Sequence, residues 1–198
     1  LTGLGRATRL RHLFQSPFTL HREMLRAIEQ ETANARAGRR GQIIAKMNAL
    51  LEPEVLAALY QASQAGVQID LIVRGVCALR PGVPGMSENI RVCSVIGRFL
   101  EHTRVFYFHN DGAEIVYLSS ADWMGRNFFG RVETCFPVLD AELKRRVIDE
   151  GLRPYLEDNT QAWIMGEDGH YACRVAGRAK PVSAQEHLLE LLAHKPGA

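Results

Sequence analysis

The sequence predicts an α/β domain with a mixed central sheet flanked by helices, and three segments carry that prediction. Two apolar runs, 42–48 and 69–73, enclose a helical segment that opens at Glu52-Pro53, as in a β-α-β unit with parallel strands. Two aromatic-rich runs within 105–118 are joined by Asn110-Asp111-Gly112, a pattern typical of an antiparallel hairpin. A sheet that holds both units is mixed.

The remaining elements follow from caps and periodicity. Ser16-Pro17 predicts an N-cap followed by proline in the first helical position, and Gly38 predicts the end of that helix. The other expected elements are a glycine- and proline-rich loop over 75–90, a strand over 131–139, a helix that Asp140 caps and that runs through Tyr155, an irregular segment or second hairpin over 160–176, and a helix over 183–194 with a capping box of Ser183 and Glu186.

Composition limits the function classes. A net charge of +2 argues against a bulk binder of nucleic acid, so any anion site must be a local cluster of cations. The four cysteines form no C-x-x-C pair, which fits reduced thiols in the cytoplasm and argues against zinc. We expect a cytoplasmic protein, with peripheral membrane association as the alternative. The start Leu1-Thr2-Gly3 leads us to expect a piece cut from a longer chain.

A candidate site surrounds the hairpin. His102 and Arg104 stand two residues apart just before it, and Ser119, Ser120 and Asn127 follow its second strand. Because a hairpin returns the chain to its starting edge, these residues are expected to lie together. Imidazole, cation and hydroxyl groups are those that phosphoryl chemistry requires, and His102 is predicted to be catalytic because its proton exchanges near neutral pH.

Further polar residues adjoin the predicted strand ends. Arg74 closes the second apolar run, where its guanidinium fits phosphate oxygens; a structural salt bridge is the alternative. Lys46 and Asn48 are expected on one face of the first strand, either facing an anion or as a solvated pair. Asp122 and Arg126 are expected to orient His102 or a phosphate, although Asp122 also fits a local cap. Arg74, His102 and Arg104 are predicted to open onto one cleft.

The His102-x-Arg104 pair, the paired serines and Asn127 resemble the His-x-Lys and serine motif of the phospholipase D superfamily. Arg104 replaces that family's lysine, and His109 occupies the position of its aspartate, which argues against an ordinary phospholipase or nuclease. A longer resemblance is to the carboxyl-terminal region of the long bacterial polyphosphate kinases. The blocks that carry it are residues 16–20, 43–75, 79–92, 97–108 and 116–127.

This resemblance implies a second phospholipase D-like domain over 13–198, preceded by the tail of a first one over 1–12. It implies an enzyme that reversibly transfers the terminal phosphoryl group of ATP to inorganic polyphosphate through a phosphohistidine. That histidine and the magnesium ligands belong to the first domain, so no metal ligand is expected here and the isolated piece is expected to be inactive. By residue match, Arg74 and His102 contact nucleotide phosphate, and His102 is the catalytic partner. The supporting polyanion contacts are Lys46, Asn48, Arg104, Ser119, Ser120, Arg126 and Asn127.

The resemblance also implies partners and leaves alternatives. The partners are ATP or ADP, polyphosphate, the amino-terminal domains of the same enzyme, and further copies in a homo-oligomer; nucleic acid is not expected. One alternative is a self-sufficient phosphodiesterase of the phospholipase D type, which needs a homodimer to bring two copies of His102 together. The other is a non-catalytic module that binds polyphosphate.

Overall fold

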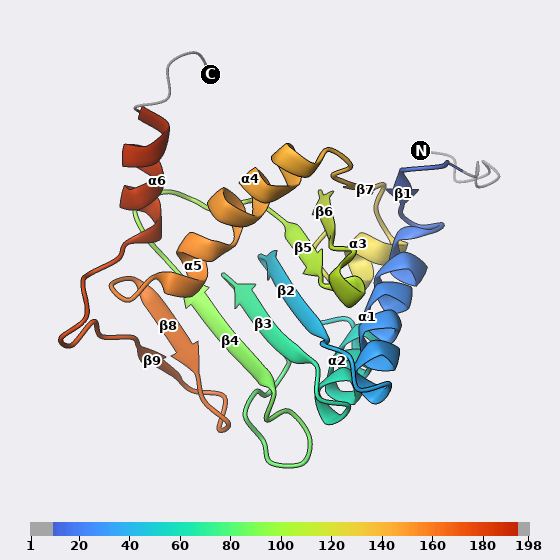
Figure 1. Ribbon diagram of the computed structural model, residues 1–198, viewed down its shortest axis with the longest axis horizontal. Coiled ribbons are helices and arrows are strands. Elements are labelled where there is room, and N and C mark those ends of the chain that lie inside the picture. The colour runs from blue at the N-terminus through green and yellow to red at the C-terminus, as the bar shows by residue number, and fades with distance from the viewer. Residues whose placement is uncertain (1–9, 194–198) are drawn as a thin grey trace.

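The computed structural model describes residues 10–193, and its strands form one mixed sheet in the order β1-β7-β6-β5-β2-β3-β4-β8-β9 (Figure 1). The strands are β1 (Phe14–Gln15), β2 (Gln42–Met47), β3 (Gln68–Val73), β4 (Ile90–Val95), β5 (Val105–Phe108), β6 (Ile115–Ser119), β7 (Thr134–Pro137), β8 (Ala162–Met165) and β9 (Tyr171–Cys173). The helices are α1 (Leu20–Arg36), α2 (Pro53–Gln64), α3 (Gly125–Phe129), α4 (Ala141–Gly151), α5 (Arg153–Glu157) and α6 (Ala184–Ala193), with a 3-10 turn at Asn110–Gly112.

The two units predicted from the sequence lie in the same sheet. Strands β2 and β3 are parallel, with Lys46 opposite Ile72, and β4 continues the parallel set. Strands β5 and β6 form the antiparallel hairpin, with Val105 opposite Leu118. Because β5 also pairs antiparallel with β2, the sheet is mixed, as predicted. At the hairpin turn, Asn110 and Asp111 adopt positive φ angles, which suit asparagine and aspartate.

Several boundaries differ from the prediction. The Ser16-Pro17 N-cap is wrong: α1 begins at Leu20, and the Ser16 amide donates to the Glu133 carbonyl beside the β1–β7 pair. Strand β4 was not predicted, since its six-residue run directly follows the glycine-rich loop and is short. The single helix expected through Tyr155 is two helices, because Pro154 cannot donate a backbone hydrogen bond within a continuous helix.

The structure decides between the two alternatives expected for residues 160–176, an irregular segment or a second hairpin. Residues 160–176 contain the second hairpin, β8 with β9, and β8 joins the sheet at β4. Helix α6 begins after Ser183 and ends at Ala193, so the predicted residue 194 lies outside the described residues. The division at residues 12 and 13 stays a prediction. Among the described helices, none has both the length and the apolar run needed to cross a membrane.

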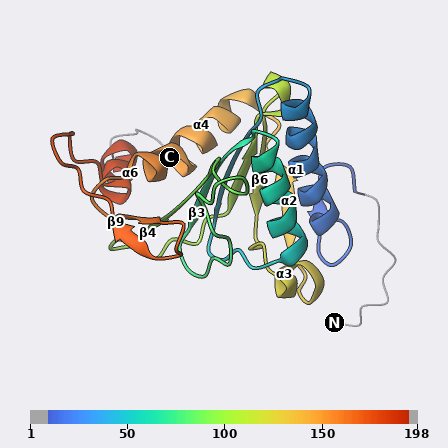
Figure 2. The same ribbon diagram turned by 90° about the horizontal axis from the view of Figure 1, so that it is seen from below.

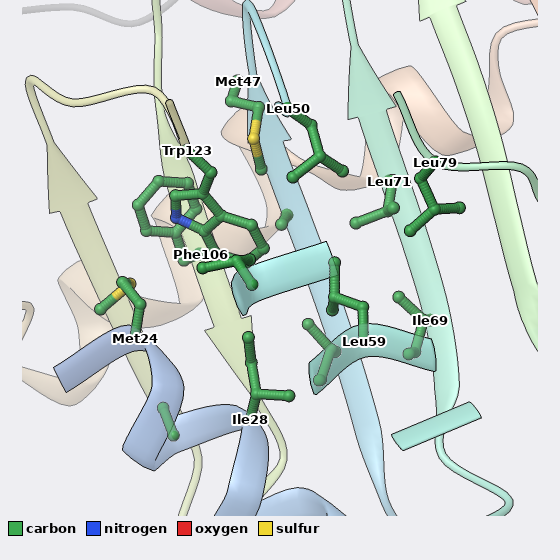
Figure 3. Close-up of a cluster of buried hydrophobic side chains, with 14 of the residues drawn as sticks. Met24, Ile28, Met47, Leu50, Leu59, Ile69, Leu71, Leu79, Phe106 and Trp123 are labelled. Carbon is green, nitrogen blue, oxygen red and sulfur yellow. The ribbon is translucent and has the colours of Figure 1, made fainter. Parts of the chain in front are cut away.

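The sheet lies between two layers of helices (Figure 2). Helices α1 and α2 cover one face, and α4, α5 and α6 cover the other. Beneath α1 and α2 the core includes Met24, Leu59, Phe106 and Trp123, all fully buried (Figure 3). The Phe106 and Trp123 rings lie 4.8 Å apart, which fixes the loop after β6 against the sheet.

Three loops meet at one edge of this sheet. The segments that follow β2, β3 and β6 are joined at Leu50, which forms isolated bridges to Cys77 and to Trp123. Because β5 runs opposite to β2, its amino-terminal end also lies at this edge. The strand directions therefore bring the residues around positions 48, 74, 104 and 122 into reach of one another.

Candidate functional site

Side chains from these strand ends, together with the Asn48 backbone amide, form one hydrogen-bonded series. The Arg74 Nε donates to Asn48 Oδ1 at 2.9 Å. The Asn48 backbone amide donates to Asp122 Oδ1 at 2.7 Å. Asp122 in turn binds Arg104, which contacts His102. The structure therefore brings Arg74, His102 and Arg104 together as predicted, while the cleft stays a prediction.

Asp122 and Arg104 form the central ion pair of this series. The Arg104 Nε and Nη2 donate to the two carboxylate oxygens of Asp122 at 3.1 and 3.0 Å. The side chains are only 9% and 6% exposed, respectively. Burial alone would raise the pKa of Asp122, but the bonds from Arg104 and from the Asn48 backbone hold it below its usual value. Asp122 therefore orients Arg104, and its charge offsets the charge of that guanidinium.

His102 is exposed and is oriented by Arg104. The Arg104 Nη1 donates to the His102 Nδ1 at 2.9 Å and to the His102 carbonyl at 2.9 Å. An arginine has no acceptor, so the His102 Nδ1 must be the unprotonated ring nitrogen in this arrangement. The Nε2 then carries the ring proton and can donate a hydrogen bond to an anionic ligand.

The serines and Asn127 lie beside this series but have structural partners. The Ser119 amide donates to the Arg104 carbonyl, and its hydroxyl bonds to the Thr134 carbonyl at 3.2 Å. Ser120 Oγ and Asn127 Nδ2 both donate to the Glu133 carboxylate, the latter at 2.7 Å. Glu133 was not predicted, and no local motif points to it.

Of the two other cations predicted to contact polyanion, Lys46 is buried and paired, and Arg126 is exposed. The Lys46 Nζ lies 2.9 Å from Glu101 Oε2 and 3.3 Å from the centre of the Tyr155 ring, and Lys46 is 4% exposed. Arg126 lies exposed at the start of α3. The polyanion contacts predicted for both residues stay predictions. Within residues 10–193 no three His, Cys, Asp or Glu side chains are grouped so as to hold a metal ion.

Solved structures place this chain in a fold class. Its structure is similar to polyphosphate kinase from Porphyromonas gingivalis, with a TM-score of 0.90 and 41% identity over 96% of this chain and 29% of that one. It is also similar to Nuc, a phospholipase D family member from Salmonella typhimurium, with a TM-score of 0.51 and 14% identity over 69% of this chain and 88% of that one. The second likeness shows the fold alone. The class is therefore an α/β domain of the phospholipase D type.

Sequence relatives identify the family. The model described as polyphosphate kinase C-terminal domain 2 matches residues 13–185. Polyphosphate kinase from Burkholderia ambifaria is 65% identical over 178 residues, and that from Paraburkholderia phytofirmans is 60% identical over 189. The chain thus belongs to the polyphosphate kinase family, as part of its carboxyl-terminal region. The matches cover 90% and 96% of this chain but only 26% and 27% of these relatives.

Proposed function

We propose that this chain is a carboxyl-terminal catalytic-region piece of a polyphosphate kinase. The whole enzyme transfers the terminal phosphoryl group of ATP reversibly to inorganic polyphosphate, through a phosphohistidine on a part that precedes this chain. The observation that most directly supports this proposal is the bonded series from Arg74 to His102, which presents an imidazole and a guanidinium at one edge of the sheet.

In this proposal Arg74 grips phosphate. Its Nε is bound to Asn48 Oδ1, which holds the guanidinium plane, and among residues 10–193 neither Nη group has a partner, so both can bind phosphate oxygens. Such charge-assisted, paired bonds are the strongest that arginine makes. The grip acts on the nucleotide before and during transfer, so Arg74 contributes to both binding and rate.

In the same proposal His102 acts on the transferring group. With Nδ1 accepting from Arg104, its Nε2–H donates a hydrogen bond to the attacking or leaving oxygen and stabilises the charge that develops there. Arg104 serves mainly to orient this ring, because Asp122 offsets its charge. The polyanion path then depends on more exposed cations such as Arg126.

Magnesium, oligomerisation and location complete the proposal. Magnesium neutralises phosphate charge in such transfers, and its ligands are proposed to lie in the part of the enzyme that precedes this chain. The full-length protein is proposed to be a homo-oligomer in the cytoplasm, with peripheral attachment to the membrane as an option.

Replacing Arg74 by alanine in the full-length protein is expected to lower kcat/KM for ATP about 10- to 100-fold, with both kcat and KM affected. The reason is that the lost bonds hold phosphate in the ground state and in the transition state. Steady-state kinetics in both directions measure this. Arg178→Ala removes an exposed arginine beyond β9 and is the matched control. If Arg74→Ala leaves kcat and KM for ATP unchanged, Arg74 does not bind phosphate in this site.

The isolated chain is expected to fold but to remain unlabelled by ATP, since the phosphohistidine lies in the preceding part. The measurement is incubation with γ-labelled ATP, followed by assay for acid-labile label on the protein. The His102→Ala version of the same chain is the control. Label that appears on the chain and vanishes with this substitution would favour the self-sufficient phosphodiesterase instead.

A further inference from the structure

The segment that carries His102 has no regular structure of its own. Residues 96–104 connect β4 to β5 without forming a helix or strand. Ordering such a segment costs backbone conformational entropy at every residue, so side-chain contacts must fix its conformation. Arg104, bound to Asp122, fixes the side that follows His102. The preceding side must be fixed by other groups.

Glu101, directly before His102, is bound by three groups from three different elements. Its carboxylate accepts from the Lys46 Nζ of β2 and the Tyr155 Oη of α5, both at 2.9 Å. The Gln185 Nε2 of α6 donates to it at 3.1 Å. Burial would raise the pKa of Glu101, but these donors hold it below its usual value.

Gln185 also holds the backbone two residues before Glu101. Its side-chain amide accepts from the Phe99 amide at 2.9 Å and donates to the Phe99 carbonyl at 2.8 Å. The segment lies so close to this amide that a Cβ added at Gly97 would stand 2.5 Å from the Gln185 Oε1. Gly97 therefore allows the close approach on which the contact depends.

We propose that Glu101 is a positioning residue for His102, and that Lys46, Tyr155 and Gln185 act on the histidine through it. This inference rests on the proposed function. Bound on one side through Glu101 and on the other through Arg104, His102 is held at a fixed place although its ring is exposed. The buried amino group of Lys46 on β2 thus helps to fix the position of segment 96–104.

Loss of the Glu101 contacts is expected to displace His102, and the reaction rate depends on the position of that ring. A displacement of about 1 Å of a catalytic group lowers a rate by roughly 10²-fold, although binding elsewhere is intact. Nucleotide binding is assigned largely to Arg74, whose partner Asn48 does not contact Glu101 through any described bond. Loss of the Glu101 contacts should therefore lower kcat while KM for ATP changes little.

The test is a double-mutant cycle in the full-length protein. Glu101→Gln keeps the size of the side chain but removes the charge that binds Lys46. We expect it to lower kcat about 10²-fold when His102 is present, with KM for ATP within about threefold. In the His102→Ala background we expect it to have no further effect on the residual kcat, because it acts through that ring.

The outcomes separate this inference from the proposed function. Equal losses of kcat in both backgrounds would show a general structural role and overturn the inference alone. A normal kcat for His102→Ala would overturn both. If Glu101→Gln folds poorly, Gln185→Ala replaces it, because this change leaves the Lys46–Glu101 pair intact; the same dependence on His102 is required. The matched control is Glu186→Gln, which removes the charge of an exposed carboxylate directly after Gln185 on α6 and should leave kcat unchanged.

Discussion

Replacing His102 by alanine in the full-length protein is expected to lower kcat by about 10²–10⁴-fold while nucleotide affinity changes little. No described residue bonds to the imidazole Nε2, and in its proposed role this nitrogen acts on charge that develops only during transfer, so the loss is expected to raise the transition-state barrier. Steady-state kinetics in both directions, together with direct measurement of nucleotide binding, give the two quantities.

The matched control for this substitution is His187→Ala. His187 is an exposed histidine on α6, and alanine suits a helix, so we expect native kinetics. If His102→Ala keeps a native kcat and only raises KM, His102 is a binding residue, and the catalytic role proposed for it is wrong.

Replacing Asp122 by alanine is expected to lower the free energy of unfolding by about 3–5 kcal/mol. The change leaves the Arg104 guanidinium, which is 9% exposed, without its carboxylate. It also removes the acceptor of the Asn48 amide. Urea unfolding of the 198-residue chain measures the loss.

A surface ion pair provides the control. Asp149 and Arg153 lie 3.1 Å apart but are 41% and 61% exposed, so Asp149→Ala should change the free energy of unfolding by about 0.2–1 kcal/mol. Similar small losses for both substitutions would contradict the structural role given to Asp122.

The Asp122–Arg104 pair also gives the stability a pH dependence. Because the folded state lowers the pKa of Asp122, the contribution of the pair is present above about pH 4 and is lost as the pH falls through the folded-state pKa. In Asp122→Ala this part of the acid destabilisation should be missing.

Local patterns accounted for the elements that the sequence predicted correctly. The β-α-β unit has the right spacing, Glu52 caps α2 by accepting from the Val55 amide, and Asn110-Asp111-Gly112 has turn chemistry. The errors arise where tertiary contacts decide. Residues 14–15 pair with β7 instead of leading directly into a helix, and β4 is stabilised as a strand by neighbours on both sides.

Only part of the site was predicted, because tertiary contacts also decide how its residues are held. Strand direction and the hairpin bring Arg74, His102 and Arg104 to one edge, which sequence reasoning captures. The groups that hold them could not be found this way, because their partners are distant in sequence. Glu101 lies 55 residues from Lys46 and 84 from Gln185, and such pairs leave no local pattern.

The contact between Phe99 and Gln185 has a consequence for the order of events during synthesis. The two residues are 86 positions apart, so a ribosome adding roughly 5–20 residues per second makes Gln185 about 4–17 s after Phe99. Strands β2 and β3 with helix α2 are complete well before that time. A nascent chain can thus hold much of its sheet while the His102 segment still lacks its contacts with Gln185, so this part of the site becomes fixed late.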